Sequence, residues 1–329
     1  MRPEIAAARL FLGTLARDSL VQALSHCPDW STLLRGSDPE GLTPLVAGVI
    51  GDTRGPFGSQ ANTLVKGQFL AQGRYQQFLI ELAELLRACQ VRGLLLKGAG
   101  LLQTVYRRYP GMRPLGDVDL FIPPQDFDRV DRVLRQAGYE VKQPMLYERG
   151  QHWVDLHLDL LNGHLLPSRA LAFRMSGEDF LARGIALQGS LEGLYVPDPV
   201  DQFLHLSVHA LKHSHGRLFW LVDLALVLRQ CGWQELLDRA RQTQSIRPLY
   251  YSLELLSEVF ALEVPARARL NLLEKWYLRK VLARPRGNVW GEVITCLSVP
   301  GWWDRLVYLC ELIRPRKRLV AYWRRLWPF

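Results

Sequence analysis

The stretch Met112-Arg-Pro-Leu-Gly-Asp117-Val-Asp119-Leu-Phe-Ile122 decides the architecture of this chain. Polar and apolar residues alternate from Asp117 to Ile122, and two prolines follow, which is typical of a β-strand that ends at a turn. Side chains two residues apart on a strand point to the same face, so Asp117 and Asp119 should lie about 7 Å apart. Two carboxylates so placed can hold one Mg²⁺ ion or straddle two.

A short apolar run precedes this strand and ends in Lys97-Gly98. Residues 93–96 read Gly-Leu-Leu-Leu, which predicts a buried strand that stops at a turn. A helix should follow, so that backbone N–H groups and the Lys97 ammonium group face one cleft, as a phosphate requires. Arg113 could neutralise phosphates or the aspartates. Each residue alone fits an exposed cation or a surface ion pair, but together with the aspartates they indicate an active site.

A second strand offers a third carboxylate. Residues 145–149 and 152–160 are expected to form a hairpin, which places Asp155, His157 and Asp159 on one face. Asp155 is the preferred third carboxylate and Asp159 is the alternative. Such a group would complete a two-metal site or accept the proton of an acceptor hydroxyl. The competing interpretation is that these aspartates are solvated residues at strand ends.

The order of these patterns predicts an α+β protein, with a small mixed sheet flanked by helical regions. Residues 1–90 form the expected N-terminal helical region, residues 91–197 the mixed domain that carries the candidate site, and residues 198–329 a C-terminal helical region. Within the mixed domain, residues 127–136 should be a helix that stops at Gly138.

Composition restricts the partners and the compartment. The 329 residues are 48% hydrophobic and 22% charged, with a net charge of +9, which suits a polyanionic partner. The five cysteines are widely spaced without a CxxC pair, which argues against a zinc site or a disulfide framework and favours a reducing cytoplasm. No apolar segment reaches the ~18–20 residues that span a bilayer, so the protein is expected to be soluble, at most peripheral to the inner membrane face.

Several segments, in this order, carry a resemblance to a known family. They are Leu94-Leu-Leu-Lys97-Gly-Ala-Gly100, the stretch around Asp117, Gln136-Ala-Gly-Tyr139, Val154-Asp-Leu-His157, His205-Leu-Ser-Val-His-Ala-Leu-Lys-His213 and Arg217-Leu-Phe-Trp-Leu-Val-Asp-Leu-Ala225. The set resembles the uncharacterised bacterial nucleotidyltransferase family of the DNA polymerase β superfamily. The resemblance covers most of the chain, from Asp29-Trp30 to beyond Asp223.

The resemblance implies a polymerase β-type palm, with Mg²⁺ or Mn²⁺ held by Asp117, Asp119 and Asp155. It also implies a nucleoside triphosphate such as ATP near Gly98 and an acceptor that is a small molecule, a glycan precursor or a protein. Lys97-Gly98 stands where the superfamily has Gly-Ser, so Lys97 would replace the serine contact electrostatically. The alternative is a catalytically silent relative that binds a nucleotide or a partner.

The helical region after residue 198 contains a row of histidines. His205, His209 and His213 recur at helical spacing, which can bind zinc, but packing is the preferred interpretation because no HExxH glutamate is present. Because the resembling helix borders the active cleft of the family, Lys212 and His213 are candidate nucleotide contacts. Asp223 would either position one of these basic groups or cap a neighbouring loop.

The C-terminal tail, residues 302–329, interleaves aromatic residues with cations. The aromatic residues are Trp302, Trp303, Tyr308, Tyr322, Trp323 and Trp327. Such a helix could contact an anionic membrane or nucleic acid weakly. The favoured interpretation is a terminal helix packed on the helical region, with its tryptophans as core anchors and its arginines in solvent.

Overall fold

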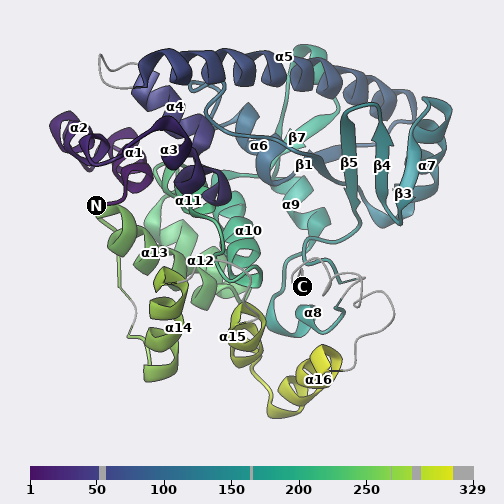
Figure 1. The fold of residues 1–329 in the computed structure, drawn as a ribbon. Helices are drawn as coiled ribbons and strands as arrows, with labels where there is room; N and C mark the ends of the chain where they lie inside the picture. The colour runs from purple at the N-terminus through teal and green to yellow at the C-terminus, as the bar shows by residue number, and fades with distance from the viewer. Residues whose placement is uncertain (52–56, 164–165, 268, 284–289, 314–329) are drawn as a thin grey trace. The chain divides into compact units, whose positions relative to one another are not determined.

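The computed structural model describes the chain except residues 52–56, 164–165, 268, 284–289 and 314–329 (Figure 1). The chain forms two compact units. Unit 1 contains Met1–Leu158 and Gly177–Asp198, and unit 2 contains Asp159–Ser176 and Pro199–Phe329. The two units are defined by which residues pack together. The predicted division at residues 90 and 197 was based on helix and strand content. That three-part division stays a prediction.

Unit 1 is built on a mixed seven-stranded sheet with the strand order β3-β4-β5-β2-β1-β7-β6. The strands are β1 (Gly93–Leu95), β2 (Val118–Phe121), β3 (Glu140–Gln143), β4 (Leu146–Arg149), β5 (His152–His157), β6 (Ile185–Ala186) and β7 (Leu194–Val196). β2 pairs in parallel with β5 and β1 with β7, and the other neighbouring pairs are antiparallel. With its flanking helices, this sheet is consistent with a nucleotidyltransferase palm, and the predicted α+β class is confirmed.

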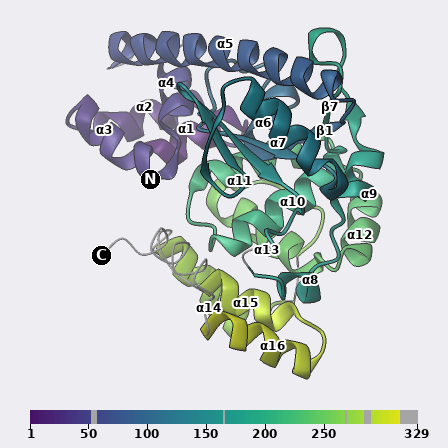
Figure 2. The same cartoon turned by 90° about the vertical axis from the view of Figure 1, so that its right-hand side faces the viewer.

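Unit 1 also contains helices. They are α1 (Pro3–Phe11), α2 (Arg17–Ser25), α3 (Trp30–Ser37), α4 (Thr43–Gly51), α5 (Gly58–Ala88), α6 (Lys97–Gln103), α7 (Phe127–Gln136) and α9 (Gly177–Arg183). The 31-residue helix α5 lies next to the sheet in both views (Figure 2).

One face of the sheet packs on α5 and α7. Val118 and Leu120 of β2 are fully buried in a core that includes Phe78 and Leu82 of α5 and Val130 of α7. Burial of large apolar side chains stabilises a fold by about 1.5–3 kcal/mol each, so this core fixes the position of β2. The residues that alternate with Val118 and Leu120 therefore point to the opposite face.

The opposite face of β2 carries Asp119 and Phe121. Both are buried, and α9 approaches Phe121 so closely that a Cβ atom on Gly177 would lie 2.1 Å from Cε2 of the Phe121 ring. Only glycine fits at that position without moving the ring. The strand face that bears Asp119 is thus fixed by close packing.

Local predictions inside the mixed domain are confirmed. Helix α7 spans residues 127–136 as expected, and Gly138 follows it with a φ of +84°. Strands β4 and β5 form the predicted antiparallel hairpin. The second strand nevertheless ends at His157, so Asp159 lies beyond it, in unit 2, and does not share the face of Asp155.

Unit 2 is helical in its described residues. Its helices are α8 (Arg169–Ala172), α10 (Pro199–Lys212), α11 (Leu218–Leu228), α12 (Trp233–Gln242), α13 (Ile246–Phe260), α14 (Leu272–Ala283), α15 (Trp290–Ser298) and α16 (Trp302–Ile313). Among the helices that the structure describes in both units, none has the length and apolar character needed to cross a membrane.

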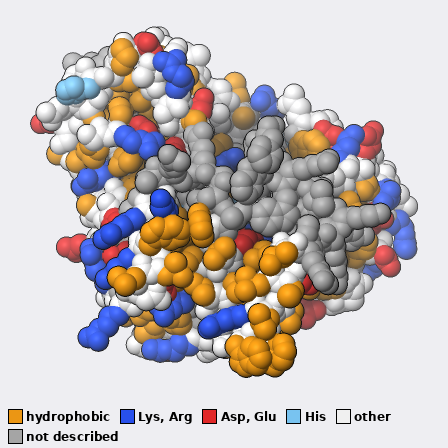
Figure 3. All heavy atoms as spheres, turned by 60° about the horizontal axis from the view of Figure 1, so that its bottom comes forward, with side chains coloured by type: hydrophobic (Ala, Val, Ile, Leu, Met, Phe, Trp, Pro, Cys, Tyr) orange, Lys and Arg blue, Asp and Glu red, His pale blue; other side chains and the backbone are white. Residues whose placement is uncertain are grey.

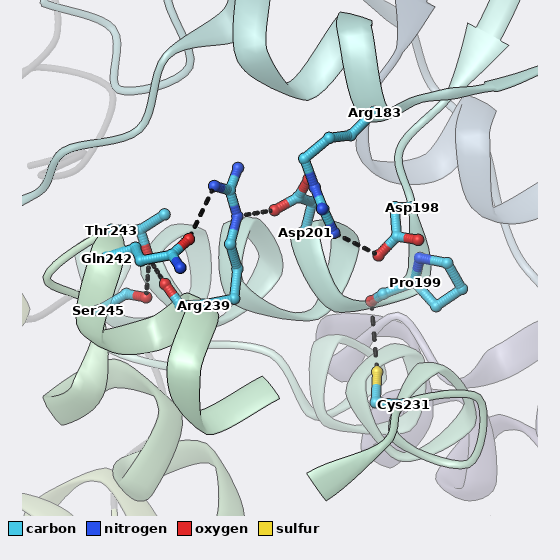
Figure 4. A network of polar contacts seen from close by, with 9 residues as sticks. All are labelled: Arg183, Asp198, Pro199, Asp201, Cys231, Arg239, Gln242, Thr243 and Ser245. Atoms are coloured by element: carbon cyan, nitrogen blue, oxygen red, sulfur yellow. Dashed lines mark hydrogen bonds and ion pairs between the residues drawn. The ribbon is translucent and has the colours of Figure 1, made fainter. Parts of the chain in front are cut away.

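Buried polar contacts tie the helices of unit 2 together. Nε of Arg239 on α12 donates to Oδ1 of the fully buried Asp201 on α10 at 2.6 Å (Figure 4). The thiol of Cys231 donates to the carbonyl oxygen of Pro199 at 3.4 Å. Removing one partner of a buried ion pair typically costs about 3–5 kcal/mol, so the Asp201 pair constrains how α10 and α12 pack.

The predicted packing of the C-terminal tail is only partly correct. Tyr308 of α16 is fully buried, as a core anchor should be. Trp302 and Trp303 are each 64% exposed, so the expectation that they are core anchors is wrong. Tyr322, Trp323 and Trp327 lie outside the described residues.

Candidate active site

The site begins with the pairing of two parallel strands. β2 and β5 are neighbours, and their register places Asp119 opposite Asp155 and Phe121 opposite His157. Partners in adjacent strands point to the same face, so Asp119, Asp155 and His157 converge. Ligand atoms of these three residues all lie within 4.8 Å of one another, which could hold a metal ion.

His157 connects the two carboxylates. Its Nε2 atom lies 2.8 Å from Oδ1 of Asp119 and 3.5 Å from Oδ2 of Asp155. Burial and the charge of Lys97 would lower the pKa of His157, but its hydrogen bonds to Asp119 and Asp155 outweigh them and raise it. The imidazole ring therefore bridges the two carboxylates. The predicted strand carried His157 on this face without a role, and its position two residues after Asp155 was the available signal.

The carboxylate of Asp119 stays ionised although it is buried. It is 6% exposed, and burial alone would raise its pKa. The Lys97 ammonium group and the His157 hydrogen bond more than offset burial, so the pKa of Asp119 is held well below its ordinary value. The carboxylate is consequently ionised throughout the physiological range.

Asp117 lies one residue before β2 and is exposed as a residue. Loss of hydration around its carboxylate and the negative charge of Asp119 raise the pKa of Asp117 to about 6, although the charge of Lys97 acts in the opposite direction. Incomplete hydration among like charges, rather than full exclusion of water, therefore causes the shift. A cation bound beside it would relieve this repulsion.

Lys97 brings a positive charge to the carboxylates. Its Nζ atom donates to Oδ1 of Asp119, and its charge also interacts with Asp155 and Asp117. Burial would lower the pKa of Lys97, but Asp119 outweighs it and raises the pKa. Lys97 also has a φ of +44°, in the left-handed region that normally favours glycine. Such strain, about 1–3 kcal/mol, persists where surrounding contacts enforce it and is common at active sites.

Gly98 and Arg113 pack against each other. A Cβ atom on Gly98 would lie 2.4 Å from Nη1 of Arg113 and 2.6 Å from Cδ1 of Leu115. The absent side chain thus makes room for the buried Arg113, whose guanidinium donates to the carbonyl oxygen of Pro114 at 3.0 Å. Arg113 also stands over the ring of Tyr106 at 6.0 Å.

The other predicted residues have local partners in unit 2. Nζ of Lys212 donates to Oδ1 of Asn162 at 2.8 Å, and the ring of His213 lies 4.7 Å from that of His209. Oδ1 of Asp159 accepts hydrogen bonds from the backbone N–H groups of Leu161 and Gly163, both at 2.8 Å, as in a capped turn. Asp223 is fully buried.

The sequence of the chain matches a protein-family model described as uncharacterised nucleotidyltransferase over residues 26–261. The chain belongs to this family. The matched range includes every residue of the site and both helices that carry the histidines and Asp223. No curated protein and no solved structure matches the chain. Membership of this family supports nucleotidyl transfer as the general activity of the chain.

The donor atoms of the site suit the divalent metal that nucleotidyl transfer generally uses. Carboxylate oxygens are the ligands that Mg²⁺ and Mn²⁺ prefer, and Asp119 and Asp155 are adjacent. The Lys97 ammonium group already rests on Asp119, which shows that this position attracts a cation. The raised pKa of Asp117 points the same way, because an added positive charge would lower it. The residues present therefore fit such an ion.

Proposed function

We propose that the chain is an Mg²⁺-dependent nucleotidyltransferase that transfers a nucleotidyl group from a nucleoside triphosphate to an acceptor hydroxyl or phosphate. The register that sets Asp119 beside Asp155 on neighbouring parallel strands carries the proposal. It supplies two adjacent carboxylates on a rigid sheet, with a third, Asp117, two residues before Asp119.

Asp117, Asp119 and Asp155 would hold the metal. When bound, Mg²⁺ or Mn²⁺ would neutralise phosphate charge and polarise the α-phosphate. His157 orients Asp119 and Asp155 through its Nε2 atom, which lies within reach of both carboxylates. The side chain of Asp155 is 35% exposed, so an acceptor can reach its carboxylate.

Asp155 is the proposed base. In the transfer, the acceptor oxygen forms a bond to the α-phosphorus while the bond between this phosphorus and the α–β bridging oxygen breaks. Pyrophosphate leaves with the electron pair of that bond. A carboxylate oxygen of Asp155 takes the proton of an acceptor hydroxyl, and an acceptor phosphate needs no such transfer.

Cationic residues are proposed to bind the triphosphate. Lys97, at the start of α6, supplies positive charge next to the aspartates. Arg113 packs on Gly98, the residue that follows Lys97, and supplies a second cation. Lys212 and His213 stay proposed nucleotide contacts from unit 2. The acceptor is a small molecule, a glycan precursor or a protein, and the reaction takes place in the cytoplasm, where the five thiols stay reduced.

One observation favours a second function, a catalytically silent nucleotide-binding protein. The ammonium group of Lys97 contacts the carboxylate of Asp119 that a metal would need. A permanently paired Asp119 would leave nucleotide binding intact and suppress turnover. Calorimetric binding of Mg²⁺ and NTP without turnover on any acceptor would support this function.

The proposal is tested by Asp119→Asn, which removes the ligand charge and keeps the shape of the side chain. We expect pyrophosphate release from labelled NTPs, screened over hydroxyl-bearing acceptors, to fall by at least about 10³-fold with an unchanged circular dichroism spectrum. The matched control is Asp128→Asn, the same change at an exposed aspartate of α7, which should keep wild-type turnover. Equal activity of Asp119→Asn and wild type would refute the site.

A further inference from the structure

Helix α16 is held from one side by polar contacts within unit 2. The buried Tyr308 hydroxyl donates to Oε2 of Glu292 on α15, and Oε1 of Glu292 accepts from the buried Arg169 of α8. The backbone N–H of Ser168 donates to Oε2 of Glu311 at 3.0 Å. These contacts fix the rotation of α16 about its own axis, because a turn of the helix would leave the Glu292 carboxylate without its Tyr308 partner.

The charged groups of α16 lie away from its outward side, which is the side opposite Tyr308. Nε of Arg305 donates to the carbonyl oxygen of Val299, just past the end of α15, at 2.7 Å. The carboxylate of Glu311 accepts the hydrogen bond from Ser168, and Asp304 lies two residues after Trp302. At 100° per residue around the helix axis, Asp304 and Glu311 lie about 150° from Leu306, the centre of the outward side.

The outward side of α16 is wholly apolar. Trp302, Leu306, Leu309 and Ile313 follow each other at steps of four, three and four residues, and Trp303 and Val307 flank them. Their exposed fractions are large: 64% for each tryptophan, 77% for Ile313, and 37–48% for Leu306, Val307 and Leu309. The two indole rings stack at 4.3 Å. Figure 3 shows hydrophobic side chains gathered on the face that includes the bottom of Figure 1, where α15 and α16 lie.

A basic sequence follows this apolar side directly. Residues 314–318 read Arg-Pro-Arg-Lys-Arg, and the last sixteen residues contain six lysines and arginines and no acidic residue. Tryptophans next to clustered cations in the sequence suit the surface of an anionic bilayer. Indole rings prefer the headgroup region, and the cations are attracted to negatively charged headgroups. Twelve residues make a helix of about 18 Å, too short to cross the ~30 Å hydrocarbon core.

We propose that α16 docks in the plane of an anionic membrane, with its apolar side in the headgroup–acyl boundary. The cationic sequence that follows α16 is the reason for an anionic surface. Apolar burial and charge attraction add together in such an attachment, which is reversible and weakened by salt. A second copy of the chain would bury the tryptophans equally well, but it would bring like charges together, because the chain has a net charge of +9.

The test is co-sedimentation of the full chain with vesicles of phosphatidylcholine containing 30% phosphatidylglycerol, compared with phosphatidylcholine alone. We expect binding to the anionic vesicles that falls at least tenfold in the Trp302→Ser/Trp303→Ser double variant. Phe69→Ser/Leu70→Ser is the matched control, since it removes a similarly exposed apolar pair from α5 and should not change binding. Changing the four cations of residues 314–318 to Gln should also lower binding at least tenfold, given about fivefold per cation.

Thermal melting shows whether a loss of binding is caused by unfolding. The double variant should melt within a degree or two of wild type because both indoles are exposed, and Ile313→Glu is a second variant that should lose binding for the same reason. Wild-type protein that ignores anionic vesicles would overturn the proposal. So would a loss of binding with the Gln variant alone, which would indicate charge attraction without α16.

Two other outcomes would assign α16 to a different partner and also overturn the proposal. A dimer in analytical ultracentrifugation that Trp302→Ser/Trp303→Ser dissociates, without vesicle binding by wild type, would assign α16 to a second copy of the chain. Binding of homopolymeric RNA that depends on the cations and not on the tryptophans, again without vesicle binding, would assign the tail to nucleic acid.

Discussion

The ammonium group of Lys97 pairs with the carboxylate of Asp119 across two antiparallel strands. Leu95 and Leu120 are partners in the β1–β2 ladder, and the N–H of Leu96 donates to the carbonyl oxygen of Asp119 at 2.9 Å. Lys97 therefore comes opposite the end of β2 as soon as β1 stops. Its left-handed backbone sets the direction in which the side chain leaves, so that geometry and charge together place a cation on the candidate metal ligand.

Replacing Lys97 with glycine should separate strain from charge. Glycine relieves about 1–3 kcal/mol of backbone strain, but it takes the ammonium group away from the buried Asp119. Removing one partner of a buried ion pair costs about 3–5 kcal/mol. The second effect is larger, so we expect Lys97→Gly to lower the melting temperature in chelator. Saturating Mg²⁺ should restore it, since 100 Kd of a ligand adds about 2.7 kcal/mol. Differential scanning calorimetry with and without Mg²⁺ measures both.

The matched control for Lys97 is Lys66→Ala, which removes an exposed lysine from α5. It should change neither the melting temperature nor its response to Mg²⁺. A Lys97→Gly protein that is more stable than wild type in chelator would mean that strain outweighs the ion pair.

Asp155 and Asp159 should respond differently to the same substitution. Asp155→Asn should lower kcat/KM to the level of Asp119→Asn, because Asp155 lies in register with Asp119. Asp159→Asn should keep most activity and lower stability by about 1 kcal/mol, because the carboxylate holds two backbone N–H groups of its own turn. Steady-state kinetics and thermal melting of both variants provide the comparison. The reverse order of activities would move the third carboxylate to Asp159.

The raised pKa of Asp117 predicts a pH-dependent stability. Because the folded pKa of about 6 exceeds the ordinary value of 3.8, the native state keeps a proton that the unfolded chain releases between these pH values. Stability from this group is therefore present below about pH 4 and lost as the pH rises through 6. The melting-temperature advantage of Asp117→Asn over wild type should grow from pH 4 to pH 6.5 in chelator and then level off. A constant difference across that range would exclude the shift.

Gly98→Ala should weaken nucleotide binding through Arg113. The added Cβ atom would meet Nη1 of Arg113 at 2.4 Å, so the guanidinium has to move, at about 1–3 kcal/mol of overpacking. We expect a higher KM for NTP, or a weaker Kd by calorimetry, and a lower melting temperature. Gly67→Ala is the control, because no atom lies within 4 Å of its added Cβ, and alanine should stabilise α5 slightly. An unchanged Kd for Gly98→Ala would remove Arg113 from the nucleotide site.

Local patterns predicted the parts of the fold that depend on neighbours in sequence. The alternation around Asp119, the helix over residues 127–136 and the hairpin that contains Asp155 all follow from short-range periodicity. The end of β5 at His157 was not predictable, because Leu158 and Asp159 continue the same alternation and only the turn that Asp159 caps ends the strand.

The remaining features depend on contacts between distant residues. A left-handed lysine at position 97 contradicts the intrinsic preference of its residue type, so no local pattern indicates it. The role of His157 depends on strand pairing, which brings its ring to Asp119. Which side of α16 turns outward follows from the contact of Tyr308 with Glu292, sixteen residues earlier in the chain.

The fit of Phe121 against Gly177 has a genetic consequence. The ring fills the space where any side chain at position 177 would begin, and Phe121 is the neighbour in register of His157. A substitution at Gly177 would therefore be scored in a screen as an active-site allele, although its own side chain takes part in no chemistry. Its suppressors should be found at position 121, where a smaller residue such as leucine restores room, and such second-site revertants would reveal the contact without any structure.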